Sequence, residues 1–262
     1  MRILQNEIKI NRVPLLIWSL SIGALIAMCV FMFPDMKNEM DQVNKIFSSM
    51  GNFTAAFGMD QLNFGTLIGF YAVECGSIIG IGGAFYAAIT SICALMNEEK
   101  NRTAEFLMTH PLTRGRVVTE KLLAVLSQIT ILNVIVLLIA LGSIAAIGES
   151  VPMKDLLLMN LSYYLMQIEI AGLCFGISAF ITKAGIGIGI GLACGMYMLN
   201  IISNISKDAV ALKYVTAFGY TDGAQILNNG GLEVKYLAVG MALAVVGVVV
   251  AYVKYTKKDL RA

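Results

Sequence analysis

Few residues in this sequence are of the types that carry out catalysis. The one histidine, His110, is followed by Pro111 and has no cysteine near it, so it cannot form a catalytic triad. The sequence also has no Walker lysine, no HExxH, no GxSxG and no cluster of metal-ligand residues. All five cysteines lie inside apolar runs without a CxxC spacing, which is typical of small packing residues. We therefore expect no catalytic residue, no metal site and no cofactor bound by this chain.

Two acidic residues, Glu74 and Glu169, stand inside apolar runs. An ionised carboxylate within a bilayer costs at least ~2.5–3.5 kcal/mol, so each should face protein or a wet cavity, or hold a proton. One interpretation places them on a translocation pathway or at a contact with another subunit. The other interpretation is structural, with each carboxyl group hydrogen-bonded to a neighbouring Ser, Thr, Tyr or Gln.

These residues belong to a chain dominated by apolar runs. Hydrophobic residues make up 58% of the 262 residues, charged residues make up 14%, and the mean hydropathy is +0.77. Soluble proteins carry about 25% charged residues, so the composition predicts an integral membrane protein. A spanning helix needs about 20 apolar residues. The runs of roughly this length or longer are Val13–Phe33, Gly65–Met96, Leu122–Ile147, Leu156–Thr182, Gly185–Ile202 and Val234–Tyr252.

The fold we expect is therefore all-α, a polytopic membrane protein with six transmembrane helices in a single domain over residues 1–262. Lys and Arg divide unequally between the two sets of connecting segments, thirteen against six. Because cytoplasmic segments are richer in Lys and Arg, we expect both chain ends and Asn97–Lys121 in the cytoplasm. Apolar and charged residues alternate over Met1–Val13, which favours an interfacial helix on the inner leaflet, with a frayed terminus as the alternative.

Three longer segments carry further expectations. The run Gly65–Met96, at ~1.5 Å per residue, exceeds the ~30 Å hydrocarbon core, so it should project from the membrane or contain a break. Pro34–Phe64 places apolar residues on one helical face, which predicts an amphipathic helix on the outer surface or on the tops of the spans. Ser203–Glu233 is too apolar for a free loop and should fold back between the helices.

The fifth apolar run opens with a glycine-rich sequence, AGIGIGIGLACG. Its spacing matches neither GxGxxG nor the Walker A pattern, so it does not predict a phosphate-binding loop. As a helix, it places Gly187, Gly191 and Gly195 on one face. Small residues at this spacing predict close helix packing.

The longest charged segment is Asn97–Lys121, which holds five Lys or Arg, four Glu and His110. An apolar run flanks it on each side, so it must lie in water at the membrane surface, where we expect a soluble partner to bind. The segment resembles the signature region of type-2 ABC exporter permeases. The matching residues are Glu98, Glu99, Thr103, Glu105, Phe106, Leu107, Pro111, Thr113, Arg114 and Lys121, and Arg102 stands where that family usually has glycine.

The resemblance implies two paired permease subunits with two cytoplasmic ABC ATPases beneath them, and ATP and Mg²⁺ bound by the ATPases. It implies a coupling helix between the second and third spans. Within it, Thr103 can act as the N-cap, Phe106 and Leu107 as an apolar anchor, and Pro111 as the stop. The residues expected to contact the ATPase are Glu98, Glu99, Arg102, Thr103, Glu105, Phe106, Leu107, Pro111 and Arg114.

The function we expect is export, in the plasma membrane of a bacterium, with the bilayer as a further partner and no nucleic acid. The spans lack paired charges, which disfavours a small inorganic ion. The methionine-rich outer segment favours a hydrophobic or amphipathic cargo, such as an antimicrobial peptide, a drug or a lipid-like molecule. A secondary transporter or a non-transporting scaffold is the alternative. Glu74 and Glu169 favour that alternative, and the lack of a clear internal repeat disfavours it.

Overall fold

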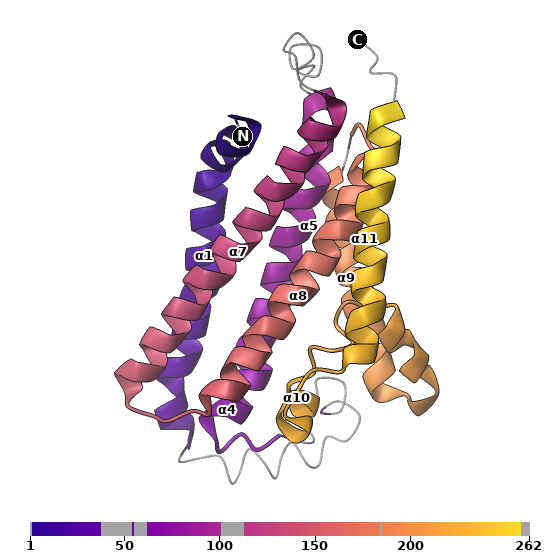
Figure 1. The fold of residues 1–262 in the computed structure, drawn as a ribbon. Helices are drawn as coiled ribbons and strands as arrows, with labels where there is room; N and C mark the ends of the chain where they lie inside the picture. Colours follow the sequence, from indigo (N-terminus) through magenta and orange to yellow (C-terminus); the bar gives the residue numbers. More distant parts are fainter. Residues whose placement is uncertain (1, 38–53, 55–61, 101–112, 184, 258–262) are drawn as a thin grey trace.

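The computed structural model of this protein describes residues 2–37, 54, 62–100, 113–183 and 185–257. Within these ranges the chain is helical without a β-strand, and six helices are long and apolar enough to cross a membrane (Figure 1). The predicted all-α fold with six spans is confirmed. The elements are α1 (Arg2–Lys37), α4 (Leu67–Phe70), the π-helix η1 (Tyr71–Cys75), α5 (Gly76–Lys100), α7 (Arg114–Ile147), α8 (Met153–Ser178), α9 (Gly185–Ile205), the 3₁₀-helix η2 (Lys207–Tyr214), α10 (Gly223–Asn229) and α11 (Val234–Lys257).

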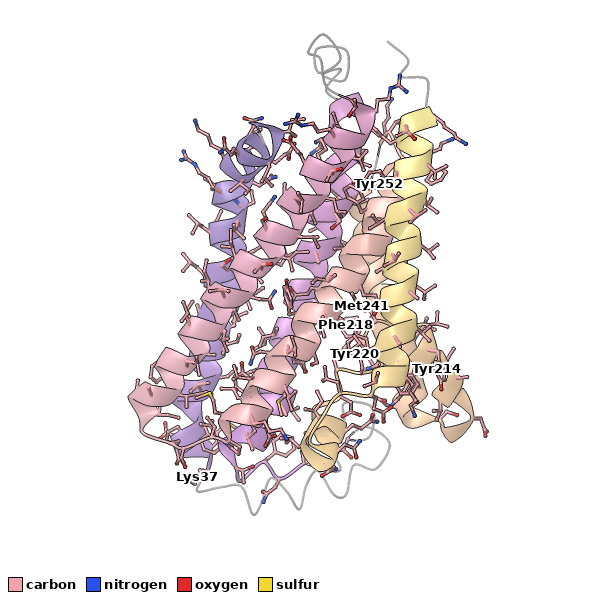
Figure 2. All side chains as sticks on the ribbon, in the orientation of Figure 1. Lys37, Tyr214, Phe218, Tyr220, Met241 and Tyr252 are labelled. Carbon is pink, nitrogen blue, oxygen red and sulfur yellow. The ribbon has the colours of Figure 1, made fainter. Side chains whose placement is uncertain are left out.

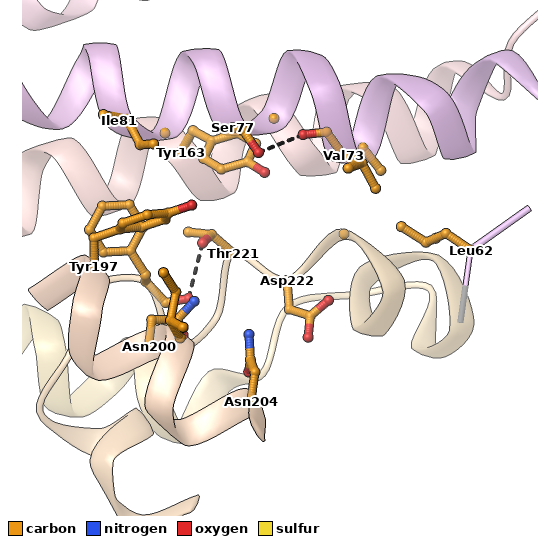
Figure 3. Close-up of a pocket in the computed structure, with 16 residues that line it drawn as sticks. Leu62, Val73, Ser77, Ile81, Tyr163, Tyr197, Asn200, Asn204, Thr221 and Asp222 are labelled. Carbon is orange, nitrogen blue, oxygen red and sulfur yellow. Dashed lines mark hydrogen bonds between the residues drawn. The ribbon is translucent and has the colours of Figure 1, made fainter. Parts of the chain in front are cut away.

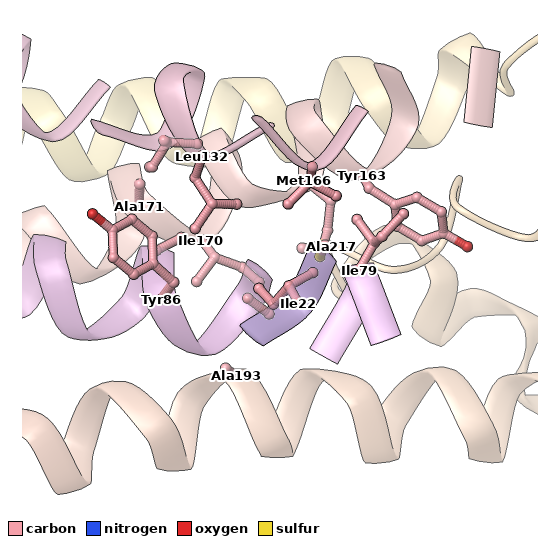
Figure 4. Packing of buried hydrophobic residues seen from close by; sticks show 14 of the residues in the cluster. Ile22, Ile79, Tyr86, Leu132, Tyr163, Met166, Ile170, Ala171, Ala193 and Ala217 are labelled. Carbon is pink, nitrogen blue, oxygen red and sulfur yellow. The ribbon is translucent and has the colours of Figure 1, made fainter. Parts of the chain in front are cut away.

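The long helices form one bundle. The start of α1, the end of α11, the end of α5 and the start of α7 lie together at what we call the terminal end, whereas α4 and α10 lie at the far end (Figure 1). α1 packs against α7, α5 packs against α8 and α9, and α8 packs against α11. Buried apolar side chains fill the interior between them, among them Ile79, Leu132 and Ile170 (Figure 4).

The first span begins earlier than predicted. α1 passes through Pro14 without interruption, so the described residues of Met1–Val13 are helical and continuous with the first span. Their place at the inner leaflet stays a prediction. The Glu120 carboxylate on α7 accepts the N–H groups of Ile3 at 3.0 Å and Leu4 at 3.3 Å. These bonds satisfy donors that the start of a helix leaves open, which favours a helix that begins there.

The second span changes its hydrogen bonding partway along. α4 passes directly into η1 and η1 into α5, so one helical stretch extends from Leu67 to Lys100. In a π-helix each N–H bonds to the carbonyl group five residues before it, and such turns are rare. The predicted excess length is therefore present as helix, and in place of a break the stretch contains a π-turn that includes Glu74.

The segment between α9 and α11 folds back against the bundle, as predicted. Phe218 and Tyr220 are buried and lie alongside α8 and α11 (Figure 2). Thr216 Oγ1 donates a hydrogen bond of 2.7 Å to the carbonyl oxygen of Met196 on α9. The Phe218 ring meets the Tyr197 ring edge-on, with centroids 5.3 Å apart. Most of Pro34–Phe64 lies outside the described residues, so its amphipathic helix stays a prediction.

Candidate functional site

A group of charged residues joins three helices at the terminal end. Lys121 of α7 is 2% exposed, and its ammonium donates to Glu7 Oε1 on α1 at 2.8 Å and to the carbonyl oxygen of Ala94 on α5 at 2.7 Å. The adjacent Glu120, which also caps α1, accepts from Arg116 Nε at 3.0 Å. We call Glu7, Arg116, Glu120 and Lys121 the terminal cluster. Because breaking a buried charge pair is costly, the cluster favours one arrangement of α1, α5 and α7.

The start of α7 also contacts α11. Thr119 Oγ1 and Tyr252 Oη lie 2.6 Å apart, and Arg114 Nη1 donates to the carbonyl oxygen of Thr256 at 3.3 Å (Figure 2 labels Tyr252). Arg114 was expected to contact an ATPase, and within this chain it contacts the last turns of α11. The first turns of α7 therefore touch α1, α5 and α11 together.

The residues expected to couple to an ATPase fall at the edge of the described part of the chain or outside it. Glu98 and Glu99 lie on the last turn of α5, and Arg114 lies on the first turn of α7. The coupling helix with its cap, anchor and stop stays a prediction. The residues outside the described ranges are Arg102, Thr103, Glu105, Phe106, Leu107 and Pro111.

Deep in the bundle, Glu169 of α8 is 1% exposed. Its Oε2 accepts a hydrogen bond of 3.0 Å from the Tyr220 hydroxyl. Burial, together with the adjacent Glu169 carboxylate, raises the pKa of Tyr220 far above its usual range, so the phenol remains a donor. Gly240 of α11 faces the same carboxyl group, and a Cβ at that position would overlap it. The structure thus shows the hydrogen-bonded arrangement for Glu169, and its role in translocation stays a prediction.

Glu74 has different surroundings. It is half-buried on η1 and makes no hydrogen bond or ion pair with any described residue. No hydrogen bond joins it to Glu169 in the described ranges, so the two carboxyl groups do not form a pair. A pathway or subunit-contact role for Glu74 also stays a prediction.

A pocket opens in the far half of the bundle, between η1 and α5, α8, α9 and the residues that lead into α10 (Figure 3). Its empty space, mouth included, is ≈ 580 Å³. Leu62, Val73 and Ile81 contribute apolar wall. The polar side chains that line it include Ser77, Tyr163, Asn200, Asn204, Thr221 and Asp222.

The glycine face predicted to pack closely meets no neighbouring helix among the described residues. A Cβ built on Gly187, Gly191 or Gly195 would meet no described atom within 4 Å. Gly189 faces α5 instead, where a Cβ would lie 3.1 Å from the carbonyl oxygen of Ala88. Close packing of this face stays a prediction, because helical periodicity identifies the residues that share a face but not the face that meets a neighbour.

Sequence reasoning missed three residues that organise the buried polar groups: Glu7, Glu120 and Tyr220. Tyr220 could have been suspected from its place in a segment too apolar to be a free loop. The signal for Glu120 was weaker, because the apolar run of the third span starts after it. Only a helix that begins at Arg114 carries Glu120 and Lys121 into the bundle.

Comparisons with known proteins agree with this architecture. A comparison with curated proteins gave no match. A family model described as "ABC-2 family transporter protein" matches residues 1–260 of the 262. This match includes all six spans, the terminal cluster and the far-half pocket. The chain therefore belongs to the ABC-2 family, as a membrane permease component of an ABC exporter.

Proposed function

We propose that this chain is the permease subunit of an exporter that moves a hydrophobic or amphipathic molecule out of the cell or its membrane. A separate cytoplasmic ATPase supplies the energy at Asn97–Lys121, and a second permease subunit completes the assembly in a bacterial plasma membrane. The observation that carries the proposal is the family match over residues 1–260. The chemistry of the sequence agrees with it, because no nucleotide-binding motif is present.

The architecture of the terminal end supports ATPase coupling there. The ends of α5 and α7 that flank residues 101–112 lie at this end with both chain ends (Figure 1). Lys121 then connects α7 to α1 and α5 through two short hydrogen bonds. Packed helices shift as units, so a partner that displaces the start of α7 would move three spans together.

The mixed polarity of the interior supports an amphipathic cargo. Neutral hydrogen bonds link the spans, with Asn133 Nδ2 donating to Gln167 Oε1 at 2.6 Å and the Tyr86 hydroxyl to Gln128 Oε1 at 3.3 Å. The far-half pocket adds apolar and polar walls side by side. A small ion needs a ring of carbonyl groups or charges to replace its hydration shell, whereas an amphiphile uses both kinds of wall.

The coupling role is tested by ATP hydrolysis. The chain is co-expressed with a candidate ABC ATPase subunit and reconstituted in vesicles, where the ATPase activity stimulated by the permease is measured. The double substitution Phe106→Asp and Leu107→Asp should abolish this stimulation, because charges replace the proposed apolar anchor. Ile10→Asp is the matched control, since Ile10 is an exposed apolar residue of α1 outside Asn97–Lys121.

Undiminished stimulation in the double variant would refute the anchor. Transport driven by a proton gradient in vesicles that contain the chain but no ATPase would instead favour the secondary-transporter alternative. In that case Glu169→Gln should stop transport, because a buried carboxyl group is the group expected to carry the proton.

A further inference from the structure

The first two spans run antiparallel, and two contacts fix how they are aligned. The Phe33 ring of α1 meets the Phe70 ring of α4, with centroids 5.5 Å apart. Nearer the terminal end, Ile22 of α1 faces Gly82 of α5, where a Cβ would lie 3.1 Å from the isoleucine side chain. Each helix therefore presents one face to the other, and helical periodicity identifies the residues between these contacts that share it.

One cysteine on each helix falls between the two contacts. Cys29 stands seven residues from Ile22, and Cys75 stands seven residues from Gly82. Seven residues make about two turns of an α-helix, so Cys29 shares the face of Ile22 and Cys75 shares the face of Gly82. Because the helices run in opposite directions, equal steps from one aligned pair lead to another. The alignment therefore places Cys29 opposite Cys75.

The side chains agree with this alignment. The two thiol groups lie within hydrogen-bonding reach of each other, and both are free. Cys75 is 0% exposed, whereas Cys29 is half-buried. Packing alone explains a single buried cysteine, but it does not require two thiols to meet. A partly accessible thiol beside a buried one is an arrangement in which an oxidised sulfur can be captured by its neighbour.

We propose that Cys29 and Cys75 form a redox modification site, at which a two-electron oxidant such as hydrogen peroxide joins the first two spans by a disulfide bond. The Cys29 sulfur attacks one peroxide oxygen, the O–O bond breaks, and a sulfenic acid and one water form. The Cys75 sulfur then attacks the Cys29 sulfur, and the S–O bond breaks. The hydroxyl group leaves with the Cys75 proton as a second water, so two thiols are oxidised and one peroxide is reduced.

The position of the pair gives the bond a structural consequence. Val73 and Gly76, on either side of Cys75, line the far-half pocket. A bond from Cys75 to Cys29 ties this pocket wall to α1. Both cysteines lie toward the end of the bundle that we predict to be outside the cytoplasm, where protein thiols meet oxidising conditions. The bond requires neither the cargo nor the ATPase of the proposed function.

The test counts free thiols in the full-length permease, reconstituted in nanodiscs without an ATPase. The protein is treated with hydrogen peroxide or left untreated, denatured in SDS, labelled with N-ethylmaleimide and measured by intact mass spectrometry. The untreated chain should carry five labels, one for each cysteine, and the treated chain should carry three. Dithiothreitol, applied and removed before labelling, should restore all five. After chymotryptic digestion, tandem mass spectrometry should identify two peptides joined through Cys29 and Cys75.

Two variants separate this pair from the other thiols. Cys75→Ala removes one partner and should give no linked peptide. Cys194→Ala is the matched control, because Cys194 is a half-buried cysteine of α9 rather than of α1 or η1. It should still lose two of its four remaining thiols. Oxidation should also raise the melting temperature of the unaltered chain and of Cys194→Ala but not of Cys75→Ala, since the bond restricts the unfolded chain.

Three outcomes overturn the assignment: five labels after treatment, a loss of two thiols that persists in Cys75→Ala, or a Cys29 that gains oxygen without joining Cys75. The linked peptide is sought in the unaltered chain, so the test holds even where Cys75→Ala does not fold. None of these outcomes bears on ATPase coupling, because the assay contains no ATPase. The two proposals therefore fail separately.

Discussion

Two buried glutamates on neighbouring helices are held in opposite ways. Glu120, 6% exposed near the terminal end, accepts hydrogen bonds from backbone N–H groups and from the guanidinium of Arg116. Glu169, 1% exposed in the middle of α8, accepts one from the neutral hydroxyl of Tyr220. Near the membrane surface a charged guanidinium group donates to the buried carboxylate, whereas in the centre of the bundle a neutral hydroxyl group is the donor. The terminal cluster is thus suited to fixing helices, and the central carboxyl group to responding to a change in its surroundings.

The largest expected effect is at the terminal cluster. Lys121→Ala leaves the Glu7 carboxylate and the Ala94 carbonyl group without their donor, which should lower the free energy of unfolding by about 3 kcal/mol. Lys235→Ala is the control, because that lysine is 58% exposed and a solvent-exposed ion pair contributes little to stability. Unfolding of the purified permease by SDS in mixed micelles measures both. Equal losses would remove the distinction between the two ends of the bundle.

The central carboxyl group depends on one neutral donor. Tyr220→Phe should lower the free energy of unfolding by about 1.5–3 kcal/mol, because a buried acceptor loses its hydrogen bond. Tyr214→Phe, at an exposed tyrosine of η2, should change little. In a Glu169→Leu background the effect of Tyr220→Phe should largely disappear. Additive losses in that double-mutant cycle would show that the two side chains are not coupled.

The close approach of α11 to this carboxyl group gives a smaller effect. Gly240→Ala forces a Cβ onto Glu169, at a cost of about 1–3 kcal/mol for overpacking, offset in part by up to ~1 kcal/mol of helix propensity. We expect a net loss of about 1–2 kcal/mol by the same unfolding assay. A gain in stability would place the Glu169 side chain elsewhere.

The smallest expected effect is on the open face of α9. Gly191→Ala adds a Cβ that meets no described atom of this chain, so helix propensity alone should raise the free energy of unfolding of the monomer by up to ~1 kcal/mol. The measurement is thermal unfolding in detergent at protein concentrations at which the chain is monomeric. A clear loss there would show that this face packs within the chain after all.

The spans could be predicted because the length and apolar composition of each run are enough to identify a membrane-spanning helix, whatever the helix packs against. The fold-back of Ser203–Glu233 could be predicted for the same reason. Pairings across the bundle could not: Glu169 and Tyr220 are 51 residues apart, and Lys121 and Glu7 are 114 residues apart. The spacing of residues within one helix does not show which residues of distant helices are in contact. A single sequence contains no further signal for such contacts.

The direction of a helical face was likewise beyond the sequence. Gly187, Gly191 and Gly195 share a face as their spacing requires, yet Gly185 and Gly189 are the glycines that meet α5. The sequence did not predict that α7 begins as early as Arg114. Glu120 and Lys121 are charged, so they were assigned to the loop, and only their partners on α1 and α5 explain why they lie in the helix. The coupling residues between Arg102 and Pro111 stay a prediction from resemblance.

The π-turn over Tyr71–Cys75 makes the pocket wall depend on residue number as well as residue type. A π-turn contains one residue more than the α-helical turn that it replaces, and each residue turns a helix by about 100°. Removing one residue between Tyr71 and Cys75 would therefore leave the span helical but rotate α4 relative to α5. Leu62 and Val73 would then no longer face the same opening as Ser77 and Ile81. Deleting a single codon would in this way change which residues line the pocket, while every side chain that α5 contributes to it stays the same.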